Sequence, residues 1–419
     1  MFADRFRLSA AGVYLLMGAW GGFAFALIMA AYALYYITIA HLDALQLVLV
    51  GTALEASYFV FEIPTGVLAD TFSRRMSVII GLAIIGLAWA GQGLVPTFVA
   101  IASFEILRGV GEAFVHGATE AWVAGEVGDG AIDALFLRET QVSRLAGLAG
   151  LPVGVGLALI DLRIPVVLGG VLTTALAIAL IFVMPERRHP RNDVTHSWRA
   201  TVGTARRALW SVRTSALLVA LLGAQFFWGA ASEGYDRLWD PHLLLDLSFP
   251  PFGLPPVVGF GLLSLAGTIV VVVTAQVVRR NVKRLDERVL PKVLIAIQIV
   301  RIGGRAAFAL APSLSVALVG WFVESMVRGS FYPLFNAWLI RRTDEDVRAT
   351  VLSTTSVSSA LGQVVGGPIS GAIGKGFGIP LALLSSAFML VPALGFLARA
   401  TSGRGGAQRV TAPEASVSE

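Results

Sequence analysis

The sequence predicts an all-α membrane protein whose twelve transmembrane helices form two pseudo-symmetric six-helix bundles. Three observations lead to this fold class: the hydropathy of the chain, the spacing of its apolar segments and the placement of its basic residues. The 419 residues are 56% hydrophobic and 14% charged, and their mean hydropathy is +0.76. A water-soluble globule cannot bury so large an apolar fraction, so part of the surface must face lipid.

Apolar segments long enough to cross a bilayer occur six times in each half of the chain, since a spanning helix needs roughly 20 residues. In the first half they are expected at about 11–39, 44–69, 76–95, 98–124, 139–160 and 163–184. In the second half they are expected at about 214–238, 254–278, 290–311, 313–340, 349–373 and 379–398. We therefore predict an N-terminal bundle over 1–185, a linker over 186–213, a C-terminal bundle over 214–400 and a disordered tail over 401–419.

The basic residues are distributed unevenly between the two sides of the predicted helices. If the N terminus is cytoplasmic, the opposite side keeps only Arg163, Arg237 and Lys375. Lysine and arginine favour the cytoplasmic side, so both termini, the linker and the tail are predicted there, in a bacterial inner membrane. These scattered residues also explain the pI near 9.8 without a nucleic-acid partner. The expected partners are the lipid bilayer and a small-molecule substrate, and we expect a monomer.

The loop between the second and third predicted helices carries the most specific motif. It reads Glu62-Ile-Pro-Thr-Gly66-Val-Leu-Ala-Asp70-Thr-Phe-Ser-Arg74-Arg75. The glycine is expected to permit a tight turn, and a carboxylate four residues before a guanidinium can form a charge-assisted latch. The segment resembles the G-x-L-A-D-x-x-G-R-[RK] signature of the major facilitator superfamily of transporters, with Ser73 at a position where that family usually has glycine.

Two further motifs support the resemblance. Arg108-Gly-Val-Gly111 is similar to an R-x-x-x-G element of the family. The fifth and eleventh predicted helices carry Gly and Pro residues that resemble the G-x-x-x-G-P-x-x-G element of its antiporters, namely Gly150, Pro152, Gly154, Gly362, Gly366 and Pro368. Matched interruptions in two halves indicate helices that slide as the halves rock. The alternative for each helix is tight packing alone.

Ionisable residues inside a membrane are costly and mark functional sites by default. The fourth predicted helix carries five of them at spacings of three and four, which predicts one stripe along the helix: Glu105, Arg108, Glu112, His116 and Glu120. Histidine titrates near neutral pH, so we assign proton coupling to Glu112, His116 and Glu120, with Arg108 and Glu55 as partners. The structural alternative is that Arg108 only neutralises a neighbouring glutamate.

Residues equally far from a hairpin turn lie at similar depth in the bilayer. By this argument Glu55 and Arg108 are close enough in depth to pair, and a structural ion pair is predicted between Arg301 and Glu324. Glu233, Glu62, Tyr32 and Tyr36 are assigned to a substrate cavity. For Glu233 a solvated helix end is the alternative, and for the tyrosines ordinary packing is the alternative.

The resemblance implies a secondary transporter similar to the drug/proton antiporters of the superfamily, which work by alternating access. Asp70, Arg74 and Arg75 would latch one side of the membrane together with Gly66 and Glu126, which stands where related exporters have an aspartate. The alternatives are a facilitator or importer of a nutrient or metabolite, and a receptor that does not transport.

Several kinds of chemistry are not indicated by the sequence. It contains no Walker loop, no H-E-x-x-H and no G-x-S-x-G, its five histidines are far apart, and it has no cysteine. We therefore expect no enzyme activity, no metal and no cofactor. The expected driving force is a proton gradient.

Overall fold

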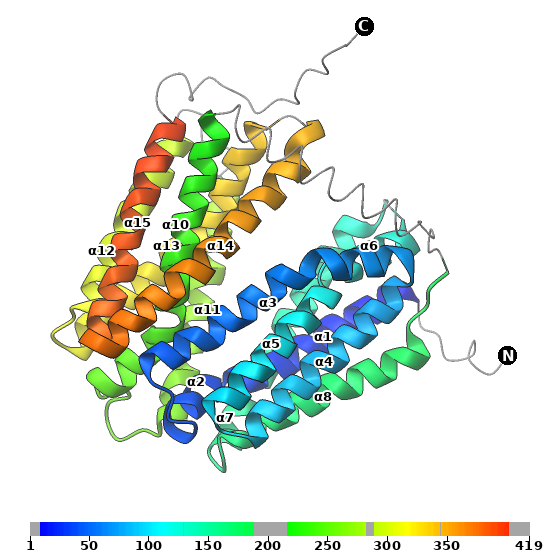
Figure 1. The fold of residues 1–419 in the computed structure, drawn as a ribbon, viewed down its shortest axis with the longest axis horizontal. Helices are drawn as coiled ribbons and strands as arrows, with labels where there is room; N and C mark the ends of the chain where they lie inside the picture. The colour runs from blue at the N-terminus through cyan, green and yellow to red at the C-terminus, as the bar shows by residue number, and fades with distance from the viewer. Residues whose placement is uncertain (1–8, 129, 188–215, 282–288, 344, 402–419) are drawn as a thin grey trace, which may run out of the picture. The chain divides into compact units, whose positions relative to one another are not determined.

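The computed structural model describes residues 9–128, 130–187, 216–281, 289–343 and 345–401, and these residues form helices joined by short loops (Figure 1). The first half of the chain contains α1 (Ala10–Met29), α2 (Tyr32–Leu34), η2 (Tyr35–Ile39), α3 (Ala44–Thr71), α4 (Arg74–Leu94), α5 (Phe98–Val115), α6 (Ala118–Val127), α7 (Ile132–Ala158) and α8 (Arg163–Val183). The second half contains α10 (Ala216–Pro241), η3 (His242–Asp246), α11 (Pro256–Asn281), α12 (Leu290–Ala309), α13 (Leu314–Arg341), α14 (Glu345–Phe377) and α15 (Ile379–Thr401). Residues 188–213 of the predicted linker and residues 402–419 of the predicted tail lie outside the described residues.

The all-α membrane fold predicted from hydropathy is confirmed, and most helix ends agree within a few residues. Among the described residues, eight helices are long and apolar enough by composition alone to cross a membrane. Two others, α5 and α12, each carry three charged residues within 18 and 20 residues, which lowers their hydropathy. Their polar side chains are the ones that build the charged sites described below.

The chain divides into two compact units. Unit 1 comprises Met1–Gln46, Ala53–Thr201 and Phe252–Gly261, and unit 2 comprises Leu47–Thr52, Val202–Pro251 and Leu262–Glu419. Two short segments, 47–52 and 252–261, therefore belong to the unit opposite to the half in which they stand in the sequence. A division at the central linker does not anticipate this exchange.

In unit 1, α1 lies along α7, and α4 lies against both α5 and α8. Glycines make these approaches close. A Cβ on Gly150 would stand 2.4 Å from the carbonyl oxygen of Phe23, and one on Gly154 would stand 2.7 Å from that of Leu27. Since backbone meets backbone, only glycine fits at these positions without moving α1 away from α7.

In unit 2, α10 packs against α14 and α15, and α12 packs against α13 and α15. Aromatic side chains fill the space between α10 and α13. Trp228 contacts Phe331 and Phe335 edge to face, with ring centroids 4.3 and 5.1 Å apart. Such pairs add to the free energy gained from burial alone. All three residues belong to an apolar core of this unit.

The fourth predicted helix is broken, which corrects the expectation of one charged stripe over 98–124. α5 ends at Val115, His116 adopts an extended conformation, and Gly117 has φ +74° before α6 begins at Ala118. Only glycine adopts this left-handed backbone without strain. Glu105, Arg108 and Glu112 therefore share a face of α5, whereas Glu120 belongs to a separate helix.

Candidate functional site

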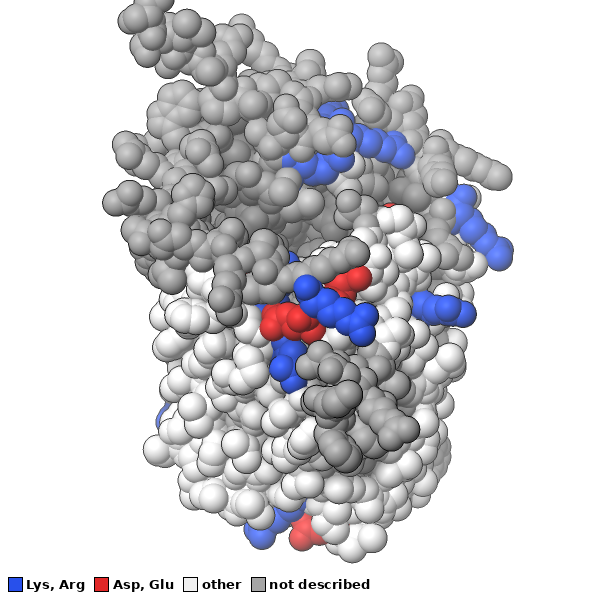
Figure 2. All heavy atoms as spheres, turned by 90° about the vertical axis from the view of Figure 1, so that its right-hand side faces the viewer, with Lys and Arg blue, Asp and Glu red and all other residues white. Residues whose placement is uncertain are grey.

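The motif loop joins α3 to α4, and its charged side chains meet as the spacing predicts. Arg74 Nη2 lies 2.9 Å from Asp70 Oδ1, and Arg74 Nη1 donates a hydrogen bond of 3.0 Å to the carbonyl oxygen of Ala121 in α6. Arg74 thereby connects the end of α3 to α6. Figure 2 shows acidic and basic side chains gathered on a face that is otherwise mostly uncharged.

The tight turn expected at Gly66 is not present. Gly66 lies inside α3, which continues to Thr71, and a Cβ at Gly66 would meet nothing within 4 Å. The chain reverses instead at Phe72 and Ser73, two residues after Asp70 of the signature. The sequence argument placed the turn too early because it attributed it to the glycine, whereas α3 is apolar enough to continue past it.

Ser73, which departs from the family signature, has two hydrogen-bonding roles at the start of α4. Its Oγ accepts from the backbone N–H of Met76 at 3.0 Å, which caps the helix, and it donates to Glu186 Oε2 at 2.6 Å. The other oxygen of Glu186 accepts from the backbone N–H of Arg75 at 3.1 Å. Glu186 follows α8, so the chain leaving the N-terminal helices is fastened to the motif loop.

Two more hydrogen bonds hold the same segment. Trp122 Nε1 donates to the carbonyl oxygen of Pro185 at 2.7 Å, and Glu126 accepts from the backbone N–H of Arg187. The guanidinium of Arg75 donates to the carbonyl oxygen of Ile181 in α8. Glu126, assigned to the latch from the sequence, is thus placed beside the motif loop and bonded to the start of the linker.

Replacing Glu186 with alanine is expected to lower the free energy of unfolding by about 1–2 kcal/mol, because two hydrogen bonds at the α4 cap are lost. Thermal unfolding of the purified protein in detergent measures the change. Arg187→Ala is the matched control, since the bond from Arg187 to Glu126 uses the backbone N–H and survives the substitution. Equal melting temperatures for the two variants would mean that the Glu186 cap contributes nothing.

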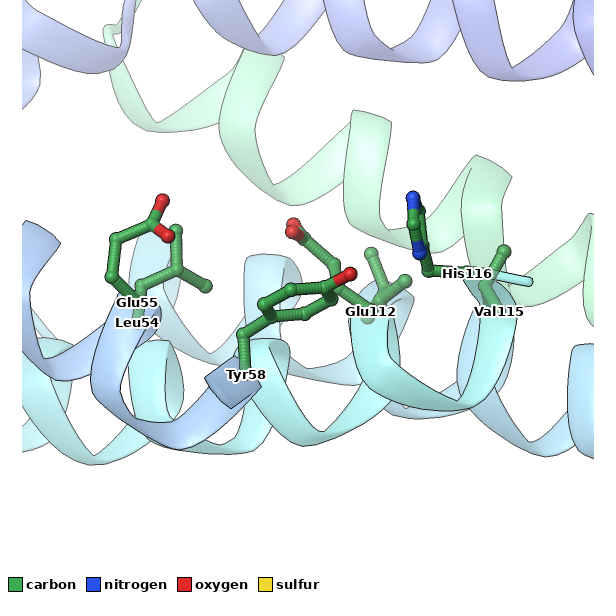
Figure 3. Close-up of a pocket in the computed structure, with 7 residues that line it drawn as sticks. Leu54, Glu55, Tyr58, Glu112, Val115 and His116 are labelled. Carbon is green, nitrogen blue, oxygen red and sulfur yellow. The ribbon is translucent and has the colours of Figure 1, made fainter. Parts of the chain in front are cut away.

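The strongest candidate site in unit 1 is a pocket of about 310 Å³, which we name the acidic pocket (Figure 3). It is lined by residues of α3, α4 and α5, namely Leu54, Glu55, Tyr58, Ile85, Glu112, Val115 and His116. In Figure 3 the carboxylates of Glu55 and Glu112 and the imidazole of His116 point to the same side of the helices. The Tyr58 ring stands edge-on to that of His116, with centroids 5.7 Å apart.

Close packing of α3 on α5 fixes the walls of the acidic pocket. A Cβ on Gly109 would stand 1.9 Å from Ser57 Oγ and 2.6 Å from the carbonyl oxygen of Leu54. One turn further on, Thr65 Oγ1 donates to the carbonyl oxygen of Ala113 at 2.9 Å. These contacts hold the polar face of α5 beside Glu55 and Tyr58.

Arg108 forms a buried ion triad with two glutamates behind the acidic pocket. Its Nη2 lies 2.6 Å from Glu105 Oε2, its Nη1 donates to Glu112 Oε1, and its guanidinium lies 4.7 Å from the centre of the Trp89 ring. The Glu105 side chain is fully buried, whereas that of Glu112 is 39% exposed. Glu112 is therefore the member of the triad that a proton or a cation can reach from the pocket.

Arg108 forms the ion pairs described above with glutamates of its own helix. In place of the predicted pairing of Glu55 with Arg108, Glu55 shares a pocket with Glu112. Glu55 and Glu112 line one pocket, while Arg108 lies behind Glu112. Equal depth gives the height of a side chain in the bundle but not the direction in which its helix turns it. The neutralising role of Arg108, which was the structural alternative, is present in the geometry.

The residues assigned to a substrate cavity lie in different environments. Tyr36 is buried and donates to Glu105 at 3.3 Å and to Gln92, while Tyr32 packs on the Tyr36 ring with centroids 4.4 Å apart. Glu62 accepts a hydrogen bond of 3.4 Å from Tyr58, one turn away from the acidic pocket. The packing alternative therefore describes Tyr36, whose side chain supports the ion triad.

In unit 2, the charged residues form two neighbouring networks between helices. Glu324 lies 3.4 Å from Arg301 Nε and 2.9 Å from Arg305, and all three side chains are at most 5% exposed. Asp236 binds Arg328 with both carboxylate oxygens. Glu233, assigned to the cavity, is buried and accepts from Arg237 Nε at 3.0 Å. The depth argument named Arg301 with Glu324; it missed Arg305, Asp236 and Arg328.

The Gly and Pro residues named from the sequence lie within α7 and α14. Gly362 and Gly366 bring α14 against α10, since added Cβ atoms would stand 1.9 Å from the carbonyl oxygen of Phe226 and 2.3 Å from that of Ala230. Pro152 and Pro368 stand inside their helices without ending them. Tight packing, which was the alternative interpretation of these residues, is present in both helices.

These features match a known family. A model of the Major Facilitator Superfamily matches residues 14–300, which is more than half of the chain. The chain belongs to this superfamily. It is accordingly a multi-pass membrane transporter, a class of protein that is not enzymatic.

Relatives of this superfamily member are distant in sequence and similar in fold. It is 21% identical over 355 residues to the uncharacterized MFS-type transporter YxaM of Bacillus subtilis (strain 168), with 84% of this chain and 86% of the relative covered. Among solved structures, the nucleoside transporter NupG is 14% identical, with a TM-score of 0.74, 94% of this chain covered and 100% of that chain. The D-xylose-proton symporter is 14% identical, with a TM-score of 0.68, and the match covers 92% of this chain and 96% of that one. At this identity the structures show a shared fold and leave the substrate open.

Proposed function

We propose that the protein is a proton-coupled secondary transporter that exports small amphiphilic molecules by alternating access. It would lie in a bacterial inner membrane with both termini cytoplasmic, act as a monomer and use the proton gradient in place of a bound cofactor. The acidic pocket is the single observation that carries this proposal. Its lining combines apolar side chains with the carboxylates of Glu55 and Glu112 and the imidazole of His116.

The ion triad supplies a physical reason for coupling. Glu112 is held by Arg108, which Glu105 also binds from the buried side. A proton and an organic cation each compete with Arg108 for the carboxylate of Glu112. Binding of the proton therefore disfavours binding of the cation, and binding of the cation disfavours binding of the proton. The apolar wall formed by Leu54, Ile85 and Val115 suits the body of an amphiphile.

The motif loop is proposed to act as the conformational latch. Asp70 and Arg74 join α3 to α4, and the hydrogen bond from Arg74 to Ala121 adds α6, which follows the helix carrying the triad. A movement of α5 and α6 upon protonation therefore acts on this loop directly. Asp70→Asn weakens the latch because it removes the negative charge. The size of the side chain stays nearly the same.

Asp70→Asn and Glu112→Gln are each expected to abolish pH-driven transport while the protein remains folded. The measurement is a susceptibility and accumulation screen in an efflux-deficient bacterial host that expresses the wild type or either variant. Asp133→Asn, an exposed acidic position outside the acidic pocket, is the control and should behave as the wild type. Full activity in both test variants would refute this scheme.

Uptake of a nutrient or metabolite is the second candidate. It is favoured by the folds named above, whose solved members are a nucleoside transporter and a D-xylose-proton symporter. Flux measurements in proteoliposomes with and without a pH gradient separate the two candidates. An exporter moves its substrate against the proton flow, a proton-coupled importer moves it with the proton flow, and a facilitator equilibrates it whether or not the gradient is imposed.

A further inference from the structure

A second cavity, of about 350 Å³, lies in unit 1 and shares Val115 and His116 with the acidic pocket. We name it the bundle pocket. Its walls come from α1, α4, α6, α7 and α8 and from the break between α5 and α6, and its polar lining consists of Tyr14, His116, Thr119, Glu120, Glu139, Ser143 and Thr173. The proposed function uses neither Tyr14 nor Glu139.

The broken helix makes His116 common to both cavities. Val115 and His116 line the acidic pocket and also line the bundle pocket. In a continuous helix, the side chain of His116 would lie on a single face of the helix. Because the chain turns at Gly117 with φ +74°, the imidazole stands at a corner between two spaces that each contain carboxylates.

Glycines of α1 make room for the carboxylate of Glu139. A Cβ on Gly18 would stand 2.5 Å from Glu139 Oε1, and one on Gly22 would stand 2.3 Å from the carbonyl oxygen of Ser143. A larger residue at position 18 would overlap the Glu139 side chain in its present position. The packing of α1 on α7 therefore leaves an acidic side chain directed into the interior of the bundle.

The titratable groups that face the bundle pocket are few. α1 contributes Tyr14, the helix break contributes His116, α6 contributes Glu120 and α7 contributes Glu139. α4 and α8 contribute only uncharged residues, Leu82, Thr173 and Leu176, and none of the described arginines and lysines is part of the lining. The lining thus has two carboxylates beside one imidazole, and each of these groups can accept or release a proton.

The bundle pocket is connected to the motif loop through α6, which carries Thr119 and Glu120 of its lining. α6 runs from Gly117 toward that loop, where the Ala121 carbonyl oxygen accepts from Arg74. Glu139 stands two turns into α7, which begins at Ile132 shortly after α6. A proton that passes from Glu112 to Glu139 therefore moves toward the end of the bundle that carries Asp70 and Arg74.

We infer that His116 relays protons between Glu112 in the acidic pocket and Glu139 in the bundle pocket, which makes Glu139 part of the coupling route. One imidazole nitrogen takes the proton from the Glu112 carboxyl group, giving a carboxylate and an imidazolium. The other nitrogen then releases its proton to the Glu139 carboxylate, and the imidazole is left as the opposite tautomer. This inference rests on the proposed proton coupling, because a transporter without it has no use for the route.

Two measurements on the full-length protein in liposomes test the relay. Dicyclohexylcarbodiimide modifies protonated carboxyl groups in apolar surroundings, and mass spectrometry locates the product. Labelling of Glu139 is expected to be stronger at mildly acid than at mildly alkaline pH, and His116→Gln is expected to change this pH dependence whereas Asp133→Asn leaves it unchanged. A Glu139 that is unlabelled at both pH values, or whose labelling ignores His116→Gln, overturns the relay.

Ethidium movement measures the consequence for transport. Glu139→Gln and His116→Gln are each expected to lower pH-driven ethidium transport about tenfold or more. Glu139→Gln, which lies outside the acidic pocket, is also expected to leave ethidium exchange at zero gradient within about twofold. Undiminished pH-driven transport in Glu139→Gln also overturns the relay. If the wild type moves no ethidium, the proposed export of amphiphiles fails, and the carbodiimide labelling still decides the relay.

Discussion

Gly362→Ala is expected to destabilise the protein by about 3 kcal/mol or more, because the added methyl group would overlap the backbone of α10. The Cβ would stand 1.9 Å from the carbonyl oxygen of Phe226 and 2.8 Å from the backbone N of Ala230. A flexible side chain can rotate away from such a contact, whereas a helix backbone cannot. The two helices would have to separate along their whole line of contact.

The adjacent turn strengthens this expectation. Gly366 stands in the same position one turn later, with a Cβ that would lie 2.3 Å from the Ala230 carbonyl oxygen. A tilt of α14 that relieved the overlap at Gly362 would therefore either press Gly366 against α10 or separate the two helices at Gly366. We expect the double variant to give little folded protein.

Gly376→Ala is the matched control for both substitutions. Gly376 lies in the same helix, and a Cβ there would meet nothing within 4 Å. Thermal unfolding in detergent, followed by tryptophan fluorescence, measures each variant. A melting temperature of Gly362→Ala equal to that of Gly376→Ala would show that α14 and α10 are not packed through these glycines.

A rescue experiment on Gly362→Ala separates a role in helix packing from a role in helix sliding. The structure shows that Gly362 and Gly366 allow close approach, and sliding of α14 during transport is a further role that the family resemblance suggests. If a stabilised background restores folding of Gly362→Ala without restoring transport, the glycine has a role beyond packing. If transport returns with stability, packing accounts for its presence.

Much of the fold could be predicted because hydropathy over about 20 residues is a strong signal. The segment expected at 163–184 is α8 over Arg163–Val183, and that expected at 76–95 is α4 over Arg74–Leu94. The break at Gly117 could not be predicted in this way. A single left-handed glycine does not interrupt an apolar run, and the chain is helical up to Val115 and again from Ala118.

Charge pairs divide by whether they lie within one helix. Those at spacings of three or four, such as Asp70 with Arg74 and Arg108 with Glu112, follow from helix geometry. Pairs between helices depend on the direction in which each helix turns its faces, which depth alone does not give. Asp236 with Arg328 was missed for this reason, although Arg305 could have been found because it stands one turn after Arg301.

Glu139 and Glu186 were missed for different reasons. Glu139 stands at the start of the helix predicted over 139–160, close in the sequence to other charged residues, and no motif singles it out. Its direction into the bundle depends on Gly18 in α1, and sequence alone does not bring these two residues together. Glu186 stands at the edge of the linker, and its bond to Ser73 joins residues far apart in the chain.

Glu324→Gln is expected to destabilise the protein by about 3–5 kcal/mol, because it leaves two buried arginines without their counter-ion. The Glu324 side chain is 1% exposed, and Arg301 and Arg305 are 5% and 0% exposed. Glutamine keeps the size of the side chain and one carbonyl acceptor, so the loss measures charge. Thermal unfolding in detergent reports it.

Asp236→Asn is the matched comparison, since Asp236 and Arg328 are 37% and 34% exposed and their charges are better solvated. We expect a clearly smaller loss of stability there. An equal or larger loss of stability in Asp236→Asn would contradict the assignment of the main burial cost to the Glu324 cluster.

A triple variant tests the cost of the buried charges directly. Arg301→Leu, Arg305→Met and Glu324→Leu made together should recover most of the stability lost in Glu324→Gln, because apolar side chains of similar volume remove the cost of buried charge. A triple variant that is folded and stable but inactive would show that this cluster serves transport, since stability alone would not require it.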